Sequence, residues 1–373
     1  MATPTTRLIV ASSESSADLR YATKFLVGDA VIFLEQKGKR TLVLSDLEID
    51  RGKREAAVDE IVALSAINKK LRPSGPEPTF RESVAEFLRS KRVTKVLVPE
   101  DFPLGLAQFL GAEGITLSVQ PGLFYPEREF KSAGELKLIR HALKITETGM
   151  ARGIEVLQTS EIRKSNSLVW AGKTLTSETL RAEIDSAILR AGGLPANTIV
   201  AGGNQACDPH ERGSGRLKAN SLIILDIFPR DAKTGYFGDL TRTVVRGRAS
   251  DAQRQLWDTV LEGQKLALRK MKPGVDGDAL HNEVKVLFTN SGYPTEQQNG
   301  RWSGFFHGTG HGLGLEIHEI PRFSRTTFQP GQVLTVEPGL YYHGIGGVRH
   351  EDVVTITETG VKLLSTHPKP LEI

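Results

Sequence analysis

The 373-residue sequence contains a single cysteine, Cys207. One thiol excludes an intrachain disulfide and a metal cluster built on cysteine. No apolar run approaches the length needed to span a bilayer, and the first residues lack the basic and apolar regions of a secretory signal. We therefore expect a cytoplasmic protein that does not associate with membranes.

An excess of charge of one sign is also missing. The chain has 48 basic and 44 acidic residues, and its net charge of +4 is too balanced to predict a nucleic-acid or membrane surface. Basic groups at 69–72 and 89–92 have no interleaved aromatic residues and are expected to be solvated. The composition is that of a globular protein, and the length predicts two domains.

The first domain is expected to be a smaller α/β unit spanning residues 1–126, which ends in a linker at 121–126. We find no catalytic constellation in it and expect it to be structural or to wall off a cleft. Apolar runs and apolar residues at helical spacing predict its elements. They are strands at 8–11 and 95–99, a hairpin of 30–34 with 41–44, and helices at 55–67 and 83–88.

The second domain is expected to span residues 127–373. Apolar stripes at helical spacing and capping residues predict four long helices. Strands are predicted between and after the helix pairs, so the order helices, hairpin, helices, hairpin indicates an internal duplication about residue 245. The helices are expected at 135–157, 177–192, 250–271 and 276–291.

A histidine- and glycine-rich segment at 306–319 is the most distinctive part of the chain. Its histidines are His307, His311 and His318, and glycine stands at every second position from 308 to 314. The four-residue step from His307 to His311 occurs in zinc-binding helices, but so much glycine argues against a helix. We expect a loop or strand that carries one or more of these imidazoles, which suit divalent first-row metals, into a cleft.

Two predicted hairpins each carry two carboxylates. Asp226 interrupts the apolar run 222–227 and Asp239 follows the turn, while Glu337 and Glu351 occupy similar places in the second hairpin. Each pair is centred on its turn, so its members are expected to face one another across antiparallel strands, about 5 Å apart. Buried carboxylates need a partner for their charge. Four carboxylates and an imidazole match two divalent cations about 3.5–4 Å apart, and histidine favours Mn, Co, Fe or Zn over Mg or Ca.

These residues resemble the five ordered metal-ligand motifs of the creatinase/methionine-aminopeptidase superfamily, and most closely those of its Xaa-Pro peptidases, aminopeptidase P and prolidase. The resemblance covers about residues 131–373, and residues 7–130 resemble more loosely the N-terminal domain of that branch. It implies an α+β protein whose catalytic domain has the pita-bread fold, a curved antiparallel sheet with two helix pairs on its outer face. The motifs are Asp226, the run Gly238-Asp239-Leu240-Thr241-Arg242-Thr243, the run Gly310-His311-Gly312-Leu313-Gly314, Val336-Glu337-Pro338-Gly339, and Arg349-His350-Glu351-Asp352.

The resemblance also implies the metal ligands and the reaction. Asp226 would chelate one ion, Asp239 and Glu351 would bridge, and His311 with Glu337 would bind the second ion. The ions would most often be manganese, with cobalt, zinc or iron as alternatives. A hydroxide bridging them would hydrolyse Xaa-Pro bonds at the N-terminus of peptides or in dipeptides, so the partners would be small peptides with proline second, and a homodimer is expected.

Further residues match positions that bind substrate, stabilise the tetrahedral intermediate or support the site in this family. They are His210, His307, His318 and Arg349. Glu337 is expected to act as the general base and to pass the proton to the imino nitrogen. A Xaa-Pro bond has no N–H, so an apolar proline pocket is needed. Trp302, Phe305 and Phe306 can form this pocket, although they fit a hydrophobic core equally well.

Three other functions are possible. A cysteine hydrolase would use Cys207 and His210, but no local signature accompanies this pair. A catalytically divergent pita-bread protein would act as an interaction module or on a non-proline substrate, and the complete set of ligand positions disfavours it. Creatinase-like amidinohydrolysis is disfavoured because that branch does not keep this ligand set.

Overall fold

The computed structural model describes residues 6–74, 76–298 and 300–373. The chain divides into two compact units, Met1–Arg128 and Glu129–Ile373. Among the described residues, no helix combines the length and the apolar character needed to cross a membrane.

The first unit is built on one six-stranded sheet with the order β4-β3-β2-β1-β5-β6. The predicted hairpin is confirmed, because β2 and β3 pair antiparallel, while β4, β5 and β6 pair parallel to their neighbours. The strands are β1 Arg7–Ala11, β2 Val31–Gln36, β3 Lys39–Leu44, β4 Glu60–Ala63, β5 Lys95–Pro99 and β6 Thr116–Gln120. The helices are α1 Ala17–Thr23, α2 Ile49–Glu55, α3 Leu64–Leu71, α4 Phe80–Ser90 and α5 Leu104–Ala112, with short 3₁₀ helices η1 Asp46–Glu48 and η2 Pro126–Glu129.

The single helix predicted at 55–67 is wrong. Helix α2 ends at Glu55, strand β4 follows, and α3 begins at Leu64. Strand β4 pairs in parallel with β3, and the Asp59 carboxylate accepts a hydrogen bond of 2.7 Å from the backbone N–H of Arg40 in β3. Sheet pairing at this edge therefore outweighs the helical spacing of the apolar residues, as tertiary contacts often do.

The four long helices of the second unit are confirmed. They are α6 Ala133–Thr159, α7 Ser177–Arg190, α8 Asp251–Lys270 and α9 Gly277–Asn290. Capping boxes open α6 at Ser132 with Glu135 and α8 at Ser250 with Gln253, so both helix starts are determined locally.

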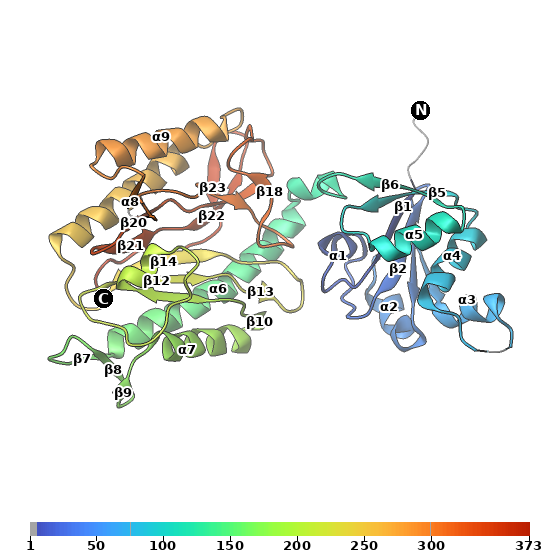
Figure 1. The fold of residues 1–373 in the computed structure, drawn as a ribbon, viewed down its shortest axis with the longest axis horizontal. Coiled ribbons are helices and arrows are strands. Elements are labelled where there is room, and N and C mark those ends of the chain that lie inside the picture. The colour runs from blue at the N-terminus through green and yellow to red at the C-terminus, as the bar shows by residue number, and fades with distance from the viewer. Residues whose placement is uncertain (1–5, 75, 299) are drawn as a thin grey trace. The chain divides into compact units, whose positions relative to one another are not determined.

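The strands of the second unit follow each helix pair, which gives the expected repeated order (Figure 1). In the first half, β11, β12 and β14 form one sheet. In the second half, β18-β17-β19-β22-β23 form a sheet next to the hairpin β20–β21. The strands are β11 Ile199–Gly202, β12 Leu222–Ile227, β14 Leu240–Val245, β17 His311–Gly312, β18 Glu319–Arg322, β19 Val333–Val336, β20 Gly339–Tyr342, β21 Gly346–Arg349, β22 Asp352–Ile356 and β23 Val361–Leu363. The smaller elements are β7 Glu161–Ile162, β8 Leu168–Trp170, β9 Lys173–Thr174, β10 Gly193–Leu194, η3 Gly203–Cys207, β13 Arg230–Asp231, β15 Glu296–Gln298 and β16 Arg301–Ser303.

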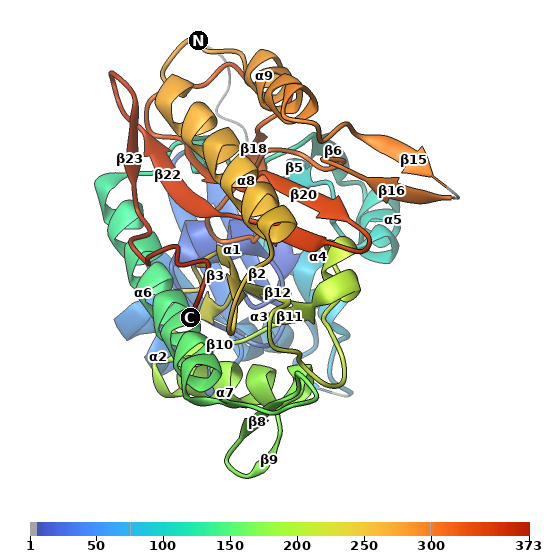
Figure 2. The ribbon, with the colours of Figure 1, turned by 90° about the vertical axis from the view of Figure 1, so that its left-hand side faces the viewer.

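Each helix pair packs mainly on the sheet of its own half. Apolar residues of α6 and α7 pack with β12 and β14, and those of α8 and α9 pack with β19, β20, β21 and β22 (Figure 2). Glycines permit the close approach within each pair. A Cβ on Gly149 of α6 would lie 2.7 Å from Ile188, and one on Gly263 of α8 would lie 2.5 Å from Phe288.

Candidate metal centre

The first carboxylate hairpin differs in register from the prediction. Asp226 in β12 pairs with Thr241 in β14, and Asp239 lies two positions before Thr241. The expected direct pairing of Asp226 with Asp239 is therefore wrong. The connecting turn is closed by a hydrogen bond of 2.8 Å from Asp231 N–H to the Tyr236 carbonyl, which moves its centre along the chain. Asp239 still shares the face of Asp226, because side chains two apart lie on one side of the sheet, as diagonal neighbours.

The second hairpin has the predicted register. Val336 pairs with Asp352 at the end of the β19–β22 ladder, and Gly339 pairs with Arg349 in the β20–β21 ladder. Glu337 consequently stands opposite Glu351, in the short gap between the two ladders.

His311 lies in β17, outside any helix, as expected for the glycine-rich segment. Its backbone N–H donates to the Thr335 hydroxyl at 3.0 Å, and Nδ1 lies 3.1 Å from the Gly312 carbonyl. Since a carbonyl only accepts, Nδ1 carries the hydrogen and Nε2 is available as a ligand. This Nε2 lies 3.2 Å from Glu337 Oε1 and 3.7 Å from Asp239 Oδ2.

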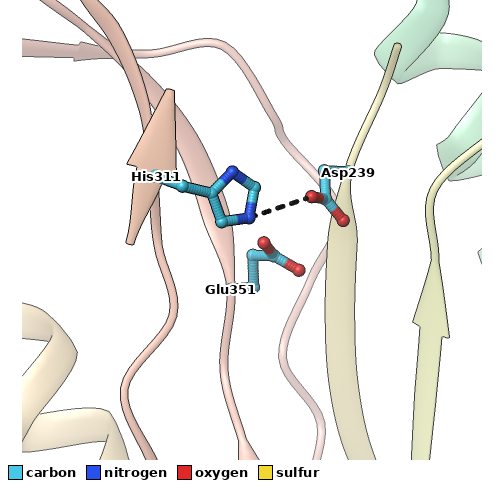
Figure 3. Close-up of side chains that lie close together, drawn as sticks. All are labelled: Asp239, His311 and Glu351. Atoms are coloured by element: carbon cyan, nitrogen blue, oxygen red, sulfur yellow. Dashed lines mark ion pairs between the residues drawn. The ribbon is translucent and has the colours of Figure 1, made fainter. Parts of the chain in front are cut away.

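Asp239, His311 and Glu351 point toward one another from three different segments (Figure 3). All three are buried, and each offers a ligand atom within 4.8 Å of the other two. The Glu351 carboxylate also accepts a hydrogen bond of 2.8 Å from the Thr241 hydroxyl. The structure therefore places two carboxylates and one imidazole around a common point.

The electrostatics of these side chains favour a cation. Burial and the neighbouring carboxylates raise the pKa of Asp239 and of Glu351 well above the usual range. Burial opposes ionisation of Glu337 as well, but its hydrogen bond with His311 lowers its pKa to about 2. Divalent cations would offset this concentration of negative charge. The carboxylate and imidazole donors present suit a divalent first-row ion.

A hydrogen-bonded chain connects Asp226 with His307. The Arg349 guanidinium donates to Asp226 Oδ2 at 2.6 Å and to the Tyr341 hydroxyl at 2.9 Å. The Tyr341 hydroxyl lies 2.8 Å from Nε2 of His307, and Nδ1 of His307 lies 2.8 Å from the Gly308 carbonyl. Because Nδ1 donates to that carbonyl, Nε2 accepts from Tyr341. Tyr341 was not among the residues selected from the sequence, because a tyrosine in an apolar strand is ordinarily a core residue.

The other two selected histidines differ in burial. The His318 ring packs edge-on against His311, with 4.4 Å between ring centroids, and burial together with His311 lowers the pKa of His318. His210 lies in an exposed loop, near enough to His318 to contribute to that shift. Burial lowers the pKa of His307 to about 4, so His307 is neutral at physiological pH.

The three aromatic residues considered for a proline pocket divide into two groups. Phe305 is 1% exposed and stacks edge-on with Phe288 in the core, so the core interpretation holds for it. Trp302 is half exposed, and Phe306 is partly buried with its ring 5.3 Å from that of Tyr341. Trp302 and Phe306 therefore remain available to a ligand.

The environment of Cys207 opposes a nucleophilic role. The thiol is buried, and burial raises its pKa to about 11. A thiolate is the nucleophilic form of cysteine, so burial keeps Cys207 in its unreactive thiol form at neutral pH.

The fold and the buried donor set define a metal-binding protein of the pita-bread class. The chain belongs to metallopeptidase family M24, whose sequence model matches residues 137–358. It is 37% identical to the Xaa-Pro dipeptidase of Pyrococcus furiosus over 179 residues, 47% of this chain and 49% of that protein. It is 32% identical to the Xaa-Pro dipeptidase of Pyrococcus horikoshii over 250 residues, 65% of this chain and 64% of that protein. The matched region thus spans about half to two thirds of these relatives.

A solved structure extends the similarity to the whole fold. The X-Pro aminopeptidase of Thermotoga maritima superposes with a TM-score of 0.83 and 25% sequence identity, covering 99% of this chain and 97% of that chain. The expected pita-bread architecture is confirmed by this likeness.

Proposed function

We propose that this protein is a peptidase that uses two divalent cations to hydrolyse the bond between a first residue and proline, in dipeptides or at the N-terminus of longer peptides. The observation that carries the proposal is the buried group of Asp239, His311 and Glu351, with Glu337 3.2 Å from the imidazole. Family membership and the names of the relatives support the substrate class.

Five residues would bind the ions: Asp226, Asp239, His311, Glu337 and Glu351. Bound there, divalent cations supply Lewis-acid polarisation of a carbonyl and a water whose pKa is lowered toward neutrality. We take manganese as the first choice, with cobalt, zinc and iron as alternatives. A cytoplasmic location and a homodimer remain predictions from the sequence.

The chain itself supplies proton transfer and orientation. Glu337 has a pKa lowered to about 2 and is ionised at neutral pH. It can therefore accept the proton of the attacking water and return it to the imino nitrogen of proline. Both ring nitrogens of His307 are occupied by the Gly308 carbonyl and Tyr341. We therefore assign contact with the developing oxyanion to His318, with His210 contributing from the exposed loop.

Two further roles are proposed, one for Arg349 in orienting Asp226 and one for the N-terminal unit. Arg349 donates to both Asp226 and Tyr341, so it would hold the Asp226 side chain in place. The unit Met1–Arg128 is proposed to be the prolidase-like N-terminal domain of this branch.

The test is hydrolysis of Ala-Pro and Ala-Pro-Ala by chelator-stripped protein, with and without added Mn²⁺. Metal-dependent cleavage of the dipeptide alone would identify a dipeptidase, and cleavage of the longer peptide would identify an aminopeptidase. Absence of both cleavages in protein that has bound Mn²⁺ would refute the proposed substrate class.

A further inference from the structure

The two glutamates of the second hairpin stand where the sheet is interrupted. The β19–β22 ladder ends at Val336 and Asp352, and the β20–β21 ladder begins at Gly339 and Arg349. The backbone N–H groups of both glutamates donate away from the hairpin. That of Glu337 donates to the Thr309 carbonyl at 2.8 Å, and that of Glu351 donates to the Thr241 carbonyl at 3.2 Å. One long backbone hydrogen bond crosses the gap, from His350 N–H to the Pro338 carbonyl at 3.4 Å, so backbone bonds hold the two strands together only weakly at the ligands themselves.

Gln264 in α8 bonds to both strands at this gap. Its side chain is buried, and Nε2 lies 2.9 Å from the Val336 carbonyl, 3.2 Å from the His350 carbonyl and 3.2 Å from Asp352 Oδ2. Val336 and His350 immediately precede Glu337 and Glu351. One amide nitrogen thus contacts the backbone next to both glutamates, and its two hydrogens are shared among three acceptors.

From this geometry we propose that Gln264 is a positioning residue for the metal centre, which fixes the separation of Glu337 and Glu351 by bonding the backbone beside each. The inference depends on the proposed function, because it assigns Gln264 to the same site. The hydrogen bonds of the Gln264 side chain go to Val336, His350 and Asp352, so it acts through the strands that carry the ligand carboxylates.

Other side chains also bond the strand that carries Glu351. Asp352 Oδ1 accepts from Arg242 Nη2 and from the Ser365 hydroxyl, both at 2.9 Å, and Lys369 pairs with Oδ2. Arg242 Nη1 also donates to the Glu351 carbonyl at 2.5 Å. The carbonyls of His350 and Glu351 are therefore bonded by Gln264 and Arg242 respectively. Of these four side chains, which are Gln264, Arg242, Ser365 and Lys369, Gln264 is the one that also bonds the strand of Glu337, at the Val336 carbonyl.

Loss of the amide has a specific consequence. Two buried carbonyls and one carboxylate oxygen would each lose a donor, and buried polar groups without partners are destabilising. The strands would shift until other donors or water compensate, and the two glutamates would move with them. Substitutions of residues that orient metal ligands typically weaken metal binding about 10- to 100-fold.

The chain offers a matched control in the same helix. Gln253 is also largely buried in α8, and its Nε2 donates to the Asn220 carbonyl at 3.2 Å, while its Oε1 accepts from Ser250 N–H at 2.9 Å. The variant Gln253→Met therefore removes a buried amide of the same kind, which belongs to the helix cap and not to the glutamate strands.

The experiment compares Gln264→Met, Gln253→Met and the unchanged full chain. Chelator-stripped proteins are titrated with MnCl₂ by calorimetry, and the thermal midpoint of each apo protein is measured. We expect Gln264→Met to bind Mn²⁺ about 10- to 100-fold more weakly, and Gln253→Met to keep the original affinity although its midpoint falls. If Gln264→Met does not fold, Gln264→Asn, whose amide is one methylene shorter, is titrated in its place with the same expectation.

Affinity equal to that of the unchanged chain in a folded Gln264 variant would overturn the inference and leave the proposed function standing. An equal loss of affinity in Gln253→Met would also overturn it, because the loss would then follow stability alone. Weaker Mn²⁺ binding in the Gln264 variant, but not in Gln253→Met, supports the inference. This result does not depend on whether either proline peptide is cleaved, so the role of Gln264 and the proposed substrate class are tested separately. An unchanged chain that binds no Mn²⁺ would overturn the metal site and the inference together.

Discussion

Replacing Tyr341 by phenylalanine tests the hydrogen-bonded chain behind the metal centre. Burial raises the pKa of Tyr341 to about 12, so the hydroxyl is protonated at neutral pH and donates to His307. The ring packs at 5.3 Å from Phe306 and 5.5 Å from His307, and phenylalanine preserves these contacts. The substitution therefore removes two hydrogen bonds and little packing.

The expected loss of kcat/KM can be estimated from the hydrogen bond that Arg349 would lose. Arg349 Nη1 donates to this hydroxyl at 2.9 Å in a buried site, and a hydrogen bond to a charged group contributes about 1.5–3 kcal/mol. If that energy is lost in the transition state, kcat/KM falls by roughly 10- to 150-fold. We expect most of the loss in kcat, because Arg349 and His307 would no longer be fixed relative to Asp226.

The assay is steady-state hydrolysis of the better proline peptide in Mn²⁺-saturated protein. Tyr342→Phe is the control, because Tyr342 is the next residue and its hydroxyl donates to the Pro294 carbonyl at 2.6 Å. We expect Tyr342→Phe to retain kcat/KM within a few-fold. Equal kcat/KM for Tyr341→Phe and the unchanged protein would refute the role of the chain Asp226–Arg349–Tyr341–His307.

The remaining predictions concern other parts of the site. Asp239→Ala should abolish Mn²⁺ binding and hydrolysis while the circular dichroism spectrum stays the same, and retained turnover would contradict the two-metal centre. Glu337→Gln should lower kcat about 10²- to 10⁴-fold. A variant whose kcat equals that of the unchanged protein at every pH would exclude Glu337 as the base. Lys131→Met removes the 2.5 Å ion pair that Lys131 makes with the buried Glu319 and should lower the free energy of unfolding in urea by up to about 3–5 kcal/mol; a loss below about 1 kcal/mol would contradict this. Cys207→Ser should retain full activity, and inactivation would revive the cysteine hydrolase.

The local chemistry of the sequence was sufficient for several elements. Helices α6 and α8 begin within two residues of the predicted starts, after the N-caps Ser132 and Ser250, because a capping box uses only neighbouring residues. The register of Glu337 against Glu351 was also predictable. A short glycine-containing turn leaves few ways to pair the flanking strands.

Two predictions were wrong, the pairing of Asp226 with Asp239 and the helix at 55–67, because hydrogen bonds beyond the local spacing determine both. The turn between β12 and β14 makes its own hydrogen bonds, from Asp231 to Tyr236, and so changes the register of Asp226. The segment 55–67 becomes a strand between two helices because β3 offers a free edge to pair with β4. Local spacing contains no information about such an edge.

The sequence by itself determined the four long helices of the second unit, the glycine-rich histidine segment and the candidate donor set, because these depend on residue type and short spacing. Only the tertiary structure showed which residues support the donors. Arg349 and Asp226 are 123 positions apart, and Gln264 lies 72 and 86 positions from the two carbonyls that it bonds. Hydrogen bonds over such separations form only when the strands and α8 pack together. The sequence around Gln264 or Tyr341 therefore gives no sign that either residue supports the donors.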